Sequence, residues 1–425
     1  MAPFTKIHRP SVGGNINIAY LTDDLLINIL SRLPLKSLLR FKCVSKAWQL
    51  LISDSFLQRI LPTPMSGLIF SDRYRNNCPV ERVQYAFITD KTHPTCNNSP
   101  TDIGNLSFFP RHRELYTVDC CNGLLLGLHR QDIYSTPVYY VINPATKKWA
   151  ELPAPAKERP HTTHRLAFDP RISPHYTLIC SGSFTGVDIF SSKTGVWVQS
   201  KVPQPLVIRH WRRSAGPMSV LFNRTLHMLS EGDSIVGFDV DGECFRLIPL
   251  PVPMPTDCRE CRQRCLGVFG GHLYYANHDG VQLQIWILED YDERKWALKH
   301  KTKIDCLVEK HPQAICSSAL YKGFCGLYEI REGGHLPFWL ADDGIIVETG
   351  EASQLYYLRE FSVLAFHPDL EVVFLGMGDT VLSYNLNSMK LEEVWVSKPQ
   401  YNGLHSGNVY PFSPCLVDFY NCKKE

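Results

Sequence analysis

The sequence predicts a multidomain α + β protein, in which a small three-helix unit precedes an all-β propeller of six or seven four-stranded blades. Two observations support this prediction. Residues 21–52 contain no glycine and one proline, and their apolar residues recur with helical spacing. From residue 63 onward, short apolar strands alternate with polar turns, and the pattern returns about every 49 residues, as it does in propeller blades.

The composition is that of a folded globular protein, with 44% hydrophobic and 20% charged residues in a chain of 425. Lysine and arginine outnumber aspartate and glutamate by only 44 to 42, so we expect no nucleic-acid partner. No stretch approaches about 18 apolar residues and the N-terminus lacks an apolar core, so we expect neither a membrane partner nor a signal peptide. Many cysteines lie inside apolar runs, which indicates a reducing compartment, the cytoplasm or the nucleus.

Three short helices follow from the residues between 21 and 52. Thr22 can cap the first helix, and Pro34 ends it or starts the second, because the residue before a proline is biased away from the helical conformation. Ser45 can cap the third helix. The apolar positions of the first helix are Leu25, Leu26, Ile29, Leu30 and Leu33. Those of the second and third are Leu35, Leu38 and Leu39, then Val44, Ala47, Trp48, Leu51 and Ile52.

These helices have more apolar surface than about forty residues can bury among themselves. The surplus has two explanations that the sequence leaves open. It can dock onto a partner protein, or it can pack on the rest of the same chain.

An aromatic residue follows the last polar turn of most of the β repeats. These aromatics are Trp149, Trp197, Phe245, Trp296 and Trp395, separated by 48, 48, 51 and 99 residues, and 99 is about twice 49. Ahead of each turn lies an apolar strand such as VYYVI or TVLSY, and ahead of that lies another such as GLLLGL or EVVFLG. The spacing therefore predicts about four strands per unit.

Blade-like units begin near residues 66, 115, 164, 216, 265, 311 and 360. The stretch 311–350 is poorly patterned, and it is either a seventh blade or an insertion that leaves six. The last apolar piece, VYPFSPCLVDF, is too short for a blade. We expect it to pair with strands near residues 66–89 and to close the ring, so that no sheet edge stays open.

The segment from Leu21 to Ile52 resembles an F-box, with its DDLL, RLP, KSL and RFKCVSKAW phrases. Thr22 stands where the usual proline follows the leading leucine. The rest of the chain resembles the F-box-associated, kelch-like propeller of large plant F-box families. The matching phrases include CNGLLLG, INPATKKWAELP, LAFDPRISPHY, LHMLS, DVDGECFRLIPLP, ILEDYDERKWALKHK and SVLAFHPDLEVVFL. The polar, glycine-containing start of the chain predicts a disordered tail at 1–17. The resemblance implies an F-box at 18–62 and a propeller at 63–425.

By the same resemblance, the protein is the substrate-recognition subunit of a Skp–cullin–F-box ubiquitin ligase. The F-box would bind a Skp-family adaptor and, through it, the cullin and RING subunits, while the propeller binds an unknown protein substrate. The adaptor-facing residues would be Leu21, Leu25, Ile29, Leu30, Leu33, Pro34, Leu38, Val44 and Trp48. No substrate-binding residue can be named, because those side chains would lie on loops of one propeller face.

A metal-like cluster occurs in DCRECRQRC, where Cys258, Cys261 and Cys265 precede His272. Zinc requires four well-placed ligands, and Cys265 begins a predicted strand. We therefore expect a polar loop with reduced thiols, no metal and no cofactor.

Other polar groups that could be taken for functional sites have structural interpretations. His161 and His164 with Arg165 are expected to be solvated near a strand, and Cys120 and Cys121 to divide between core and surface. Paired carboxylates at Asp23–Asp24 and Asp342–Asp343 fit a helix cap and a turn. We expect an exposed edge strand to present Lys299, Lys301 and Lys303.

No known catalytic motif occurs in the sequence, so we expect a non-catalytic adaptor. Two alternatives remain, an F-box scaffold that does not lead to degradation and a kelch-propeller enzyme. An enzyme would require polar residues converging at the centre of the ring.

Overall fold

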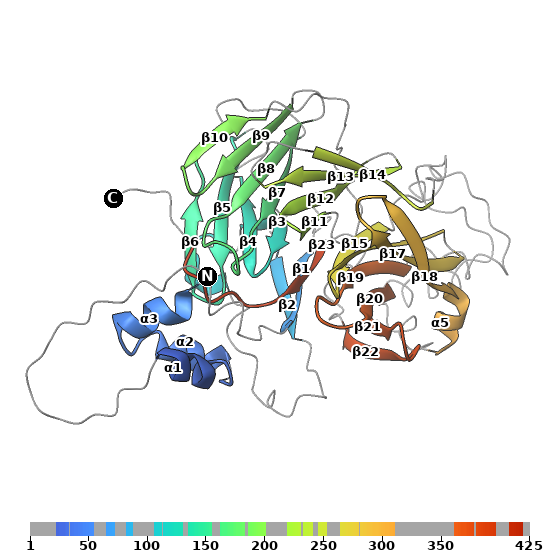
Figure 1. Cartoon of the computed structure of the whole chain (residues 1–425), viewed down its shortest axis with the longest axis horizontal. Helices are drawn as coiled ribbons and strands as arrows, with labels where there is room; N and C mark the ends of the chain where they lie inside the picture. Colours follow the sequence, from blue (N-terminus) through green and yellow to red (C-terminus); the bar gives the residue numbers. More distant parts are fainter. Residues whose placement is uncertain are drawn as a thin grey trace, which may run out of the picture.

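The structure is a computed structural model that describes residues 23–33, 35–54, 65–72, 82–87, 106–112, 114–130, 135–154, 162–182, 186–200, 219–230, 233–240, 245–252, 264–279, 281–310, 361–377, 380–396 and 408–419. Figure 1 shows a group of short helices beside a larger assembly of β-sheets. Among the described helices, none has the length and apolarity that crossing a bilayer requires.

The three predicted helices are present. They are α1 (Asp23–Leu30), α2 (Leu35–Phe41) and α3 (Lys46–Ser53). The predicted cap of the third helix is confirmed, because the Ser45 hydroxyl accepts a hydrogen bond from the backbone N–H of Trp48 at 3.2 Å. We refer to residues 23–54 as the helical module.

The strands of the described residues form six antiparallel sheets, numbered here in the order in which the chain enters them. Sheet 1 comprises β1 (Gly67–Asp72), β2 (Arg82–Phe87) and β23 (Asn408–Phe412). Sheet 2 comprises β3 (Tyr116–Cys121), β4 (Leu124–His129), β5 (Val138–Asn143) and β6 (Lys148–Glu151). Sheet 3 comprises β7 (Thr162–Ala167), β8 (Thr177–Gly182), β9 (Gly186–Ser191) and β10 (Val196–Gln199).

The other three sheets have the same order. Sheet 4 comprises β11 (Ser219–Phe222), β12 (Thr225–Leu229), β13 (Ser234–Asp239) and β14 (Phe245–Pro249). Sheet 5 comprises β15 (Arg264–Phe269), β16 (His272–His278), β17 (Gln282–Asp290) and β18 (Lys295–Lys303). Sheet 6 comprises β19 (Phe361–Phe366), β20 (Val372–Met377), β21 (Thr380–Asn385) and β22 (Leu391–Val396). A 3-10 turn (η2, Leu106–Phe108) precedes β3, and a helix (α5, Ile304–Lys310) that the sequence reading missed follows β18.

Sheet 1 is built from both ends of the β region. Its central strand β1 pairs with β2 on one side and with β23 on the other, so that Ile69 lies opposite Tyr410. The predicted pairing of the last apolar segment with strands near residues 66–89 is therefore confirmed. Figure 1 shows β23, in red, beside β1, in light blue.

Apolar clusters lie between consecutive sheets and arrange them in a ring. One cluster joins sheets 1 and 2, and others join sheets 2 and 3, 3 and 4, 4 and 5, 5 and 6, and finally 6 and 1. The run Leu124, Leu125 and Leu126 shows why these strands are continuously apolar in sequence, with no alternation of apolar and polar residues. Leu124 and Leu126 face sheet 3 while Leu125 faces sheet 1, because successive side chains point to opposite faces and both faces are covered.

The described residues thus contain five four-stranded sheets and one three-stranded sheet. Six of the seven predicted unit starts, all except residue 311, lie within a few residues of β1, β3, β7, β11, β15 and β19. The stretch 311–350 lies outside the described residues.

The aromatic repeat is confirmed as a feature of the outermost strands, since each of its five members lies on β6, β10, β14, β18 or β22.

Two sequence expectations about inner strands were wrong. Cys120 and Cys121 do face opposite sides, but both contact apolar clusters, between sheets 1 and 2 and between sheets 2 and 3. His164, expected in solvent, is buried in β7, and its ring lies 4.1 Å from that of Tyr139. His161 lies outside the described residues. The inner strand of a blade is covered on both faces by the adjacent blades, so neither face is exposed to solvent.

The predicted lysine edge is confirmed. Lys299, Lys301 and Lys303 are exposed on β18, the outermost strand of sheet 5, and Lys299 forms an ion pair of 2.9 Å with Glu371. His300, which lies between Lys299 and Lys301 and points to the opposite face, is buried, and its Nε2 atom lies 2.9 Å from the Tyr384 hydroxyl.

Candidate functional site

The helical module has a small apolar core, one member of which comes from the far end of the chain. Leu30, Leu38 and Ile52 pack together with Leu416, and all four are buried. Around them lie the partly buried side chains of Ile27, Leu33, Leu39, Phe41, Trp48 and Leu51. Packing on the same chain, one of the two explanations that the sequence left open, therefore accounts for part of the surplus apolar surface.

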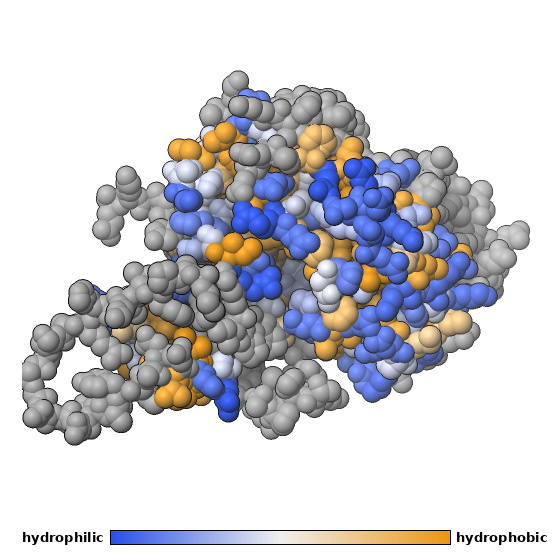
Figure 2. Space-filling model, viewed as in Figure 1, coloured by the Kyte–Doolittle hydropathy of each residue, from blue (hydrophilic) through white to orange (hydrophobic). Residues whose placement is uncertain are grey.

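Other apolar side chains of the module remain exposed. Leu25 is 52% exposed, Ile29 47% and Val44 63%, and Leu50, which the sequence reading did not select, is 67% exposed. Figure 2 shows hydrophobic residues on the visible face of the helical module. Exposed aliphatic side chains gathered on so small a unit are typical of a protein-binding surface.

Of the nine residues expected to face an adaptor, the seven that the structure describes fall into three groups. Leu25, Ile29 and Val44 are exposed, and Leu30 and Leu38 are buried against Leu416. Leu33 and Trp48 are half-buried. Leu21 and Pro34 lie outside the described residues. Trp48 packs edge-on against Phe41 with ring centroids 5.3 Å apart, so part of its area stabilises the module itself.

Residues 413–419, which we call the junction segment, run between the helical module and sheet 2 after β23 ends. Their side chains alternate in direction, as in a strand. Cys415, Val417 and Phe419 join the apolar cluster between sheets 2 and 3, while Leu416 joins the core of the helical module. In Figure 1 this part of the chain, in red, leaves β23 and passes toward the helices.

Asn143, the first residue of the NPATKKW turn, fixes the backbone of the junction segment. Its side-chain nitrogen donates to the carbonyl oxygens of Cys415 at 3.1 Å and Val417 at 3.2 Å. Its side-chain oxygen accepts from the backbone N–H groups of Ala145 and Thr146, which form the turn. Because Asn143 is fully buried, satisfying both ends of its amide is a strong constraint on the local geometry.

The glycine of the CNGLLLG phrase leaves space for the junction segment. Gly123 has a φ of +86°, and a Cβ atom there would lie 2.5 Å from the carbonyl oxygen of Ser413 and 2.7 Å from the nitrogen of Cys415. Any side chain would therefore push the segment away from sheet 2.

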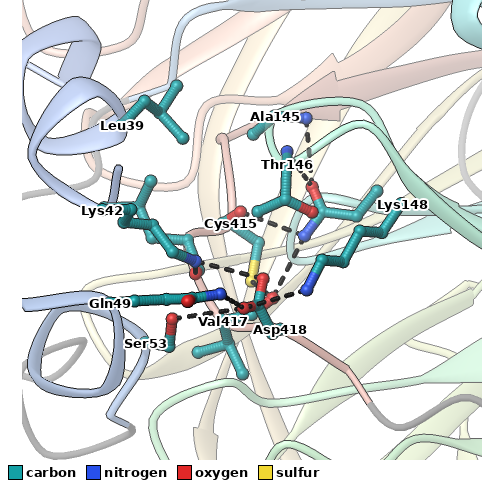
Figure 3. A network of polar contacts seen from close by, with 12 residues as sticks. Leu39, Lys42, Gln49, Ser53, Ala145, Thr146, Lys148, Cys415, Val417 and Asp418 are labelled. Carbon is teal, nitrogen blue, oxygen red and sulfur yellow. Dashed lines mark hydrogen bonds and ion pairs between the residues drawn. The ribbon is translucent and has the colours of Figure 1, made fainter. Parts of the chain in front are cut away.

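Asp418 connects the helical module to sheet 2 through charge (Figure 3). Its carboxylate lies 3.1 Å from the ammonium of Lys42, which follows α2, and 3.0 Å from that of Lys148, which begins β6. Longer hydrogen bonds reach it from Gln49 and Ser53 of α3, both at 3.5 Å. Lys42 also donates to the carbonyl oxygen of Leu416 at 2.8 Å.

Burial and ion pairing have opposite effects on the pKa values of Asp418 and Lys42 in this network. Burial would raise the pKa of Asp418, but Lys42 and Lys148 outweigh it, so the pKa of this carboxyl lies below its usual value. The pKa of Lys42 is lowered, because burial penalises the ammonium more than Asp418 favours it. The ammonium of Lys42 is therefore held in place by its partners, and removing one partner leaves a poorly solvated charge.

A second group of polar residues lies on the inner strands of the ring. A register shift in β3 leaves Val118 out of the ladder, and its carbonyl oxygen accepts from Tyr410 at 2.8 Å and Arg165 at 3.4 Å. Asp119 accepts from the backbone N–H of Leu166 at 2.8 Å. Burial raises the pKa of Asp119 to about 6, although Arg165 partly opposes the shift. These bonds run to backbone atoms of neighbouring sheets, so they hold the sheets together.

The metal-like cluster of the sequence is divided by the fold. Cys265 is buried in β15 and packs between sheets 5 and 6, where burial raises the pKa of its thiol. His272 is exposed at the turn of the β15–β16 hairpin. Cys258 and Cys261 lie outside the described residues, and within the part of the chain that the structure describes no three metal-binding side chains gather.

Sequence reasoning missed the junction. It expected VYPFSPCLVDF to close the ring, and residues 408–412 do so as β23. It did not predict that residues 413–419 would join the ring to the helices. The alternation of apolar Cys415, Val417 and Phe419 with Leu416 and Asp418 was a usable signal of a segment with two covered faces.

Comparison with known proteins identifies both parts of the chain. The family described as "F-box domain" matches residues 18–59, and the family described as "F-box protein At3g26010-like, beta-propeller" matches residues 100–318, more than half of the chain. F-box protein At5g07610 of Arabidopsis thaliana is 29% identical over 324 residues, covering 69% of this chain and 73% of that protein. F-box protein At5g49610 of the same plant is 25% identical over 363 residues, covering 76% and 95%.

Two solved structures align over about two thirds of the chain with low scores. The computationally designed Ika8 protein covers 65% of this chain and 61% of its own at 10% identity, with a TM-score of 0.31. YCF48 bound to D1 peptide has a TM-score of 0.32 at 10% identity, with coverage of 66% and 67%. Neither score bears on the fold. On the family matches, the chain belongs to the F-box proteins with an At3g26010-like β-propeller.

Proposed function

We propose that this F-box protein is the substrate-recognition subunit of a Skp–cullin–F-box ubiquitin ligase. The helical module binds the Skp-family adaptor, which brings the cullin and RING subunits, and the propeller binds the protein to be ubiquitinated. The observation that supports this best is the F-box match at residues 18–59 on a module that keeps Ile29, Val44 and Leu50 exposed. Neither matching family is a catalytic one, which favours an adaptor over a propeller enzyme.

We further propose an F-box at 18–62, a propeller at 63–425 and a six-bladed ring in which sheet 1 is the sixth blade. The clusters between each pair of consecutive sheets, including the pair 6 and 1, support this count. A propeller that closes through strands from both ends of the chain leaves no open sheet edge along its inner ring. The cytoplasm or nucleus stays the expected location.

Five of the nine residues predicted from the resemblance contribute to adaptor binding in two ways under this proposal. The exposed Leu25, Ile29 and Val44 contact the adaptor directly. Leu30 and Leu38 act from the core, because they support the helices that present those residues. Exposed Leu50 adds to the contact surface.

Charged substitutions at exposed positions test the adaptor contact without disturbing the core. The double variant Ile29→Lys with Val44→Lys should bind a purified Skp-family adaptor at least about tenfold more weakly, because two aliphatic side chains lose buried area and two charges lose water. The control is Asn28→Lys, at a position on α1 that is also exposed. Calorimetric titration gives the affinities, and far-ultraviolet circular dichroism checks the fold. Wild-type affinity in the double variant would remove the support for the ligase assignment.

Ubiquitin transfer separates the ligase from a scaffold that binds the adaptor without turnover. Partners captured by the full-length chain with the proteasome inhibited should be ubiquitinated by the reconstituted complex and not by the complex holding the double variant. Captured partners that stay unmodified with the wild-type chain would favour the scaffold.

A further inference from the structure

We propose that the junction segment is a clamp, which completes the core of the helical module and fixes the position of that module on the propeller. The proposal concerns how the two parts are joined. It goes beyond the ligase role and does not depend on which proteins either part binds.

The helical module depends on the clamp for its core. Its helices are only seven or eight residues long, and a unit of this size buries too little apolar surface to be stable alone. Leu416 is fully buried among Leu30, Leu38 and Ile52, so it is one of the four buried apolar side chains of this core. Removing it would leave a cavity that the three helices must close.

The other side of the clamp is anchored in the ring. Cys415, Val417 and Phe419 are buried between sheets 2 and 3, and Phe419 lies edge-on to Tyr176 with ring centroids 5.9 Å apart. Asn143 holds the carbonyl groups of two of these residues. Since the anchors are buried apolar groups and satisfied hydrogen bonds, the segment is a permanent part of the propeller and not a tail resting on it.

Polar contacts set the register of the clamp. Asp418 is reached by Lys42 from the helical module and by Lys148 from sheet 2, so a single carboxylate is shared by the two parts. A shift of one residue would place Leu416 against the sheets and Asp418 in the apolar core, which would bury the carboxylate without its partners.

Ring closure and module docking are therefore coupled. Phe412 is paired with Gly67 in sheet 1, and Leu416 follows it by four residues. The strand that closes the propeller thus leads directly into the segment that holds the helices. A substitution that destabilises residues 408–419 should therefore release the helical module before it unfolds the distant sheets 4, 5 and 6.

Hydrogen–deuterium exchange of the full-length chain, followed by mass spectrometry, tests the clamp. Leu416→Ala should speed exchange of the amides of α2 and α3 at least about tenfold, while amides of sheets 4 to 6 stay within about twofold of wild type. The control is Leu382→Ala, the same chemical change at a fully buried position between sheets 5 and 6. It should speed exchange in those sheets with no selective effect on the helices.

Asp418→Ala keeps the apolar core and provides a second, milder test. It should speed exchange of the same helices by about threefold or more, because Lys42 loses its carboxylate. This variant decides the matter if Leu416→Ala fails to fold. The proposal is overturned if helix exchange in the variants matches wild type, or if it rises no more than in Leu382→Ala.

Discussion

The indole nitrogen of Trp197 lies 2.8 Å from the carbonyl oxygen of Pro153, which bonds the outermost strand of sheet 3 to the residues that follow the outermost strand of sheet 2. The same contact recurs between Trp296 of sheet 5 and Pro249 of sheet 4, at 2.9 Å. Two tryptophans of the aromatic repeat, Trp197 and Trp296, therefore bond neighbouring sheets at the rim of the ring.

Trp197→Phe should destabilise the protein by more than the loss of aromatic ring area alone, because the Pro153 carbonyl also loses its hydrogen-bond donor. A matched control is Trp286→Phe, since within the described structure the buried indole N–H of Trp286 has no hydrogen-bond partner. We expect Trp197→Phe to cost about 1 kcal/mol more than the control. Urea unfolding followed by circular dichroism measures both, and equal losses would show that the rim bond contributes nothing.

Gly123→Ala should be one of the most damaging small substitutions in the chain. Its Cβ would collide with Ser413 and Cys415 backbone atoms, in addition to the strain of a φ of +86°. Gly195→Ala is the control, because Gly195 has a φ of +72° with nothing within 4 Å of the added atom. The control should cost about 1–2 kcal/mol and Gly123→Ala clearly more. Thermal melting distinguishes them, and equal losses would mean that the junction segment moves freely.

Two truncations should separate the closing strand from the junction segment. Removing residues 413–425 deletes Leu416 and Val417 but keeps β23, whereas removing 408–425 also opens sheet 1. We expect the first to loosen the helices with a moderate fall in melting temperature. The second should lower it much further, because β1 loses a paired neighbour and apolar surface is exposed. An unchanged melting temperature after the longer deletion would contradict ring closure by β23.

Acid should destabilise the protein through His227. Burial lowers the pKa of this imidazole to about 4 from an ordinary value of 6.5, so between these values the unfolded chain binds more protons than the folded one. Stability present above pH 6.5 is lost as the pH falls toward 4, by an amount of the order of 3 kcal/mol. His227→Gln should flatten part of this slope in urea titrations at several pH values. His278, whose pKa is also lowered to about 4 by burial, should supply much of the remainder.

Asp119 should act in the opposite direction. Burial raises the pKa of its carboxyl from 3.8 to about 6, so in this window the folded state holds the proton that the unfolded state has released. The Asp119 contribution to stability therefore decreases as the pH rises from about 4 to 6. In a His227→Gln background, Asp119→Asn should make the pH profile rise more steeply over this range. A profile that the substitution leaves unchanged would show that the pKa of Asp119 is not raised in the folded protein.

Much of the architecture followed from local pattern. Helical spacing and the Ser45 cap located α2 and α3, and the period of about 49 residues located the inner strands to within a few residues. Periodicity succeeds here because each blade repeats one short unit whose apolar residues must face its neighbours. The last apolar segment was correctly predicted to close the ring, since an open edge needs a partner strand.

Tertiary structure decided which face of each element is covered. His164 reads as a polar residue near a loop, yet the neighbouring sheet buries it, and Cys121 likewise lies between sheets. Leu30 and Ile29 are adjacent in the sequence and equally apolar, but Leu416 covers the first and leaves the second exposed.

The sequence by itself thus determined the helices, the repeating strands and the F-box resemblance, because these depend on residues within one repeat of each other. The junction of Lys42, Lys148 and Asp418 depended on the tertiary structure. Its members are separated by up to 376 positions, and no local pattern shows that a carboxylate near the end of the chain will meet two lysines far from it. Only closure of the ring brings the chain end back to the helices, and with it the charge and the leucine that hold them.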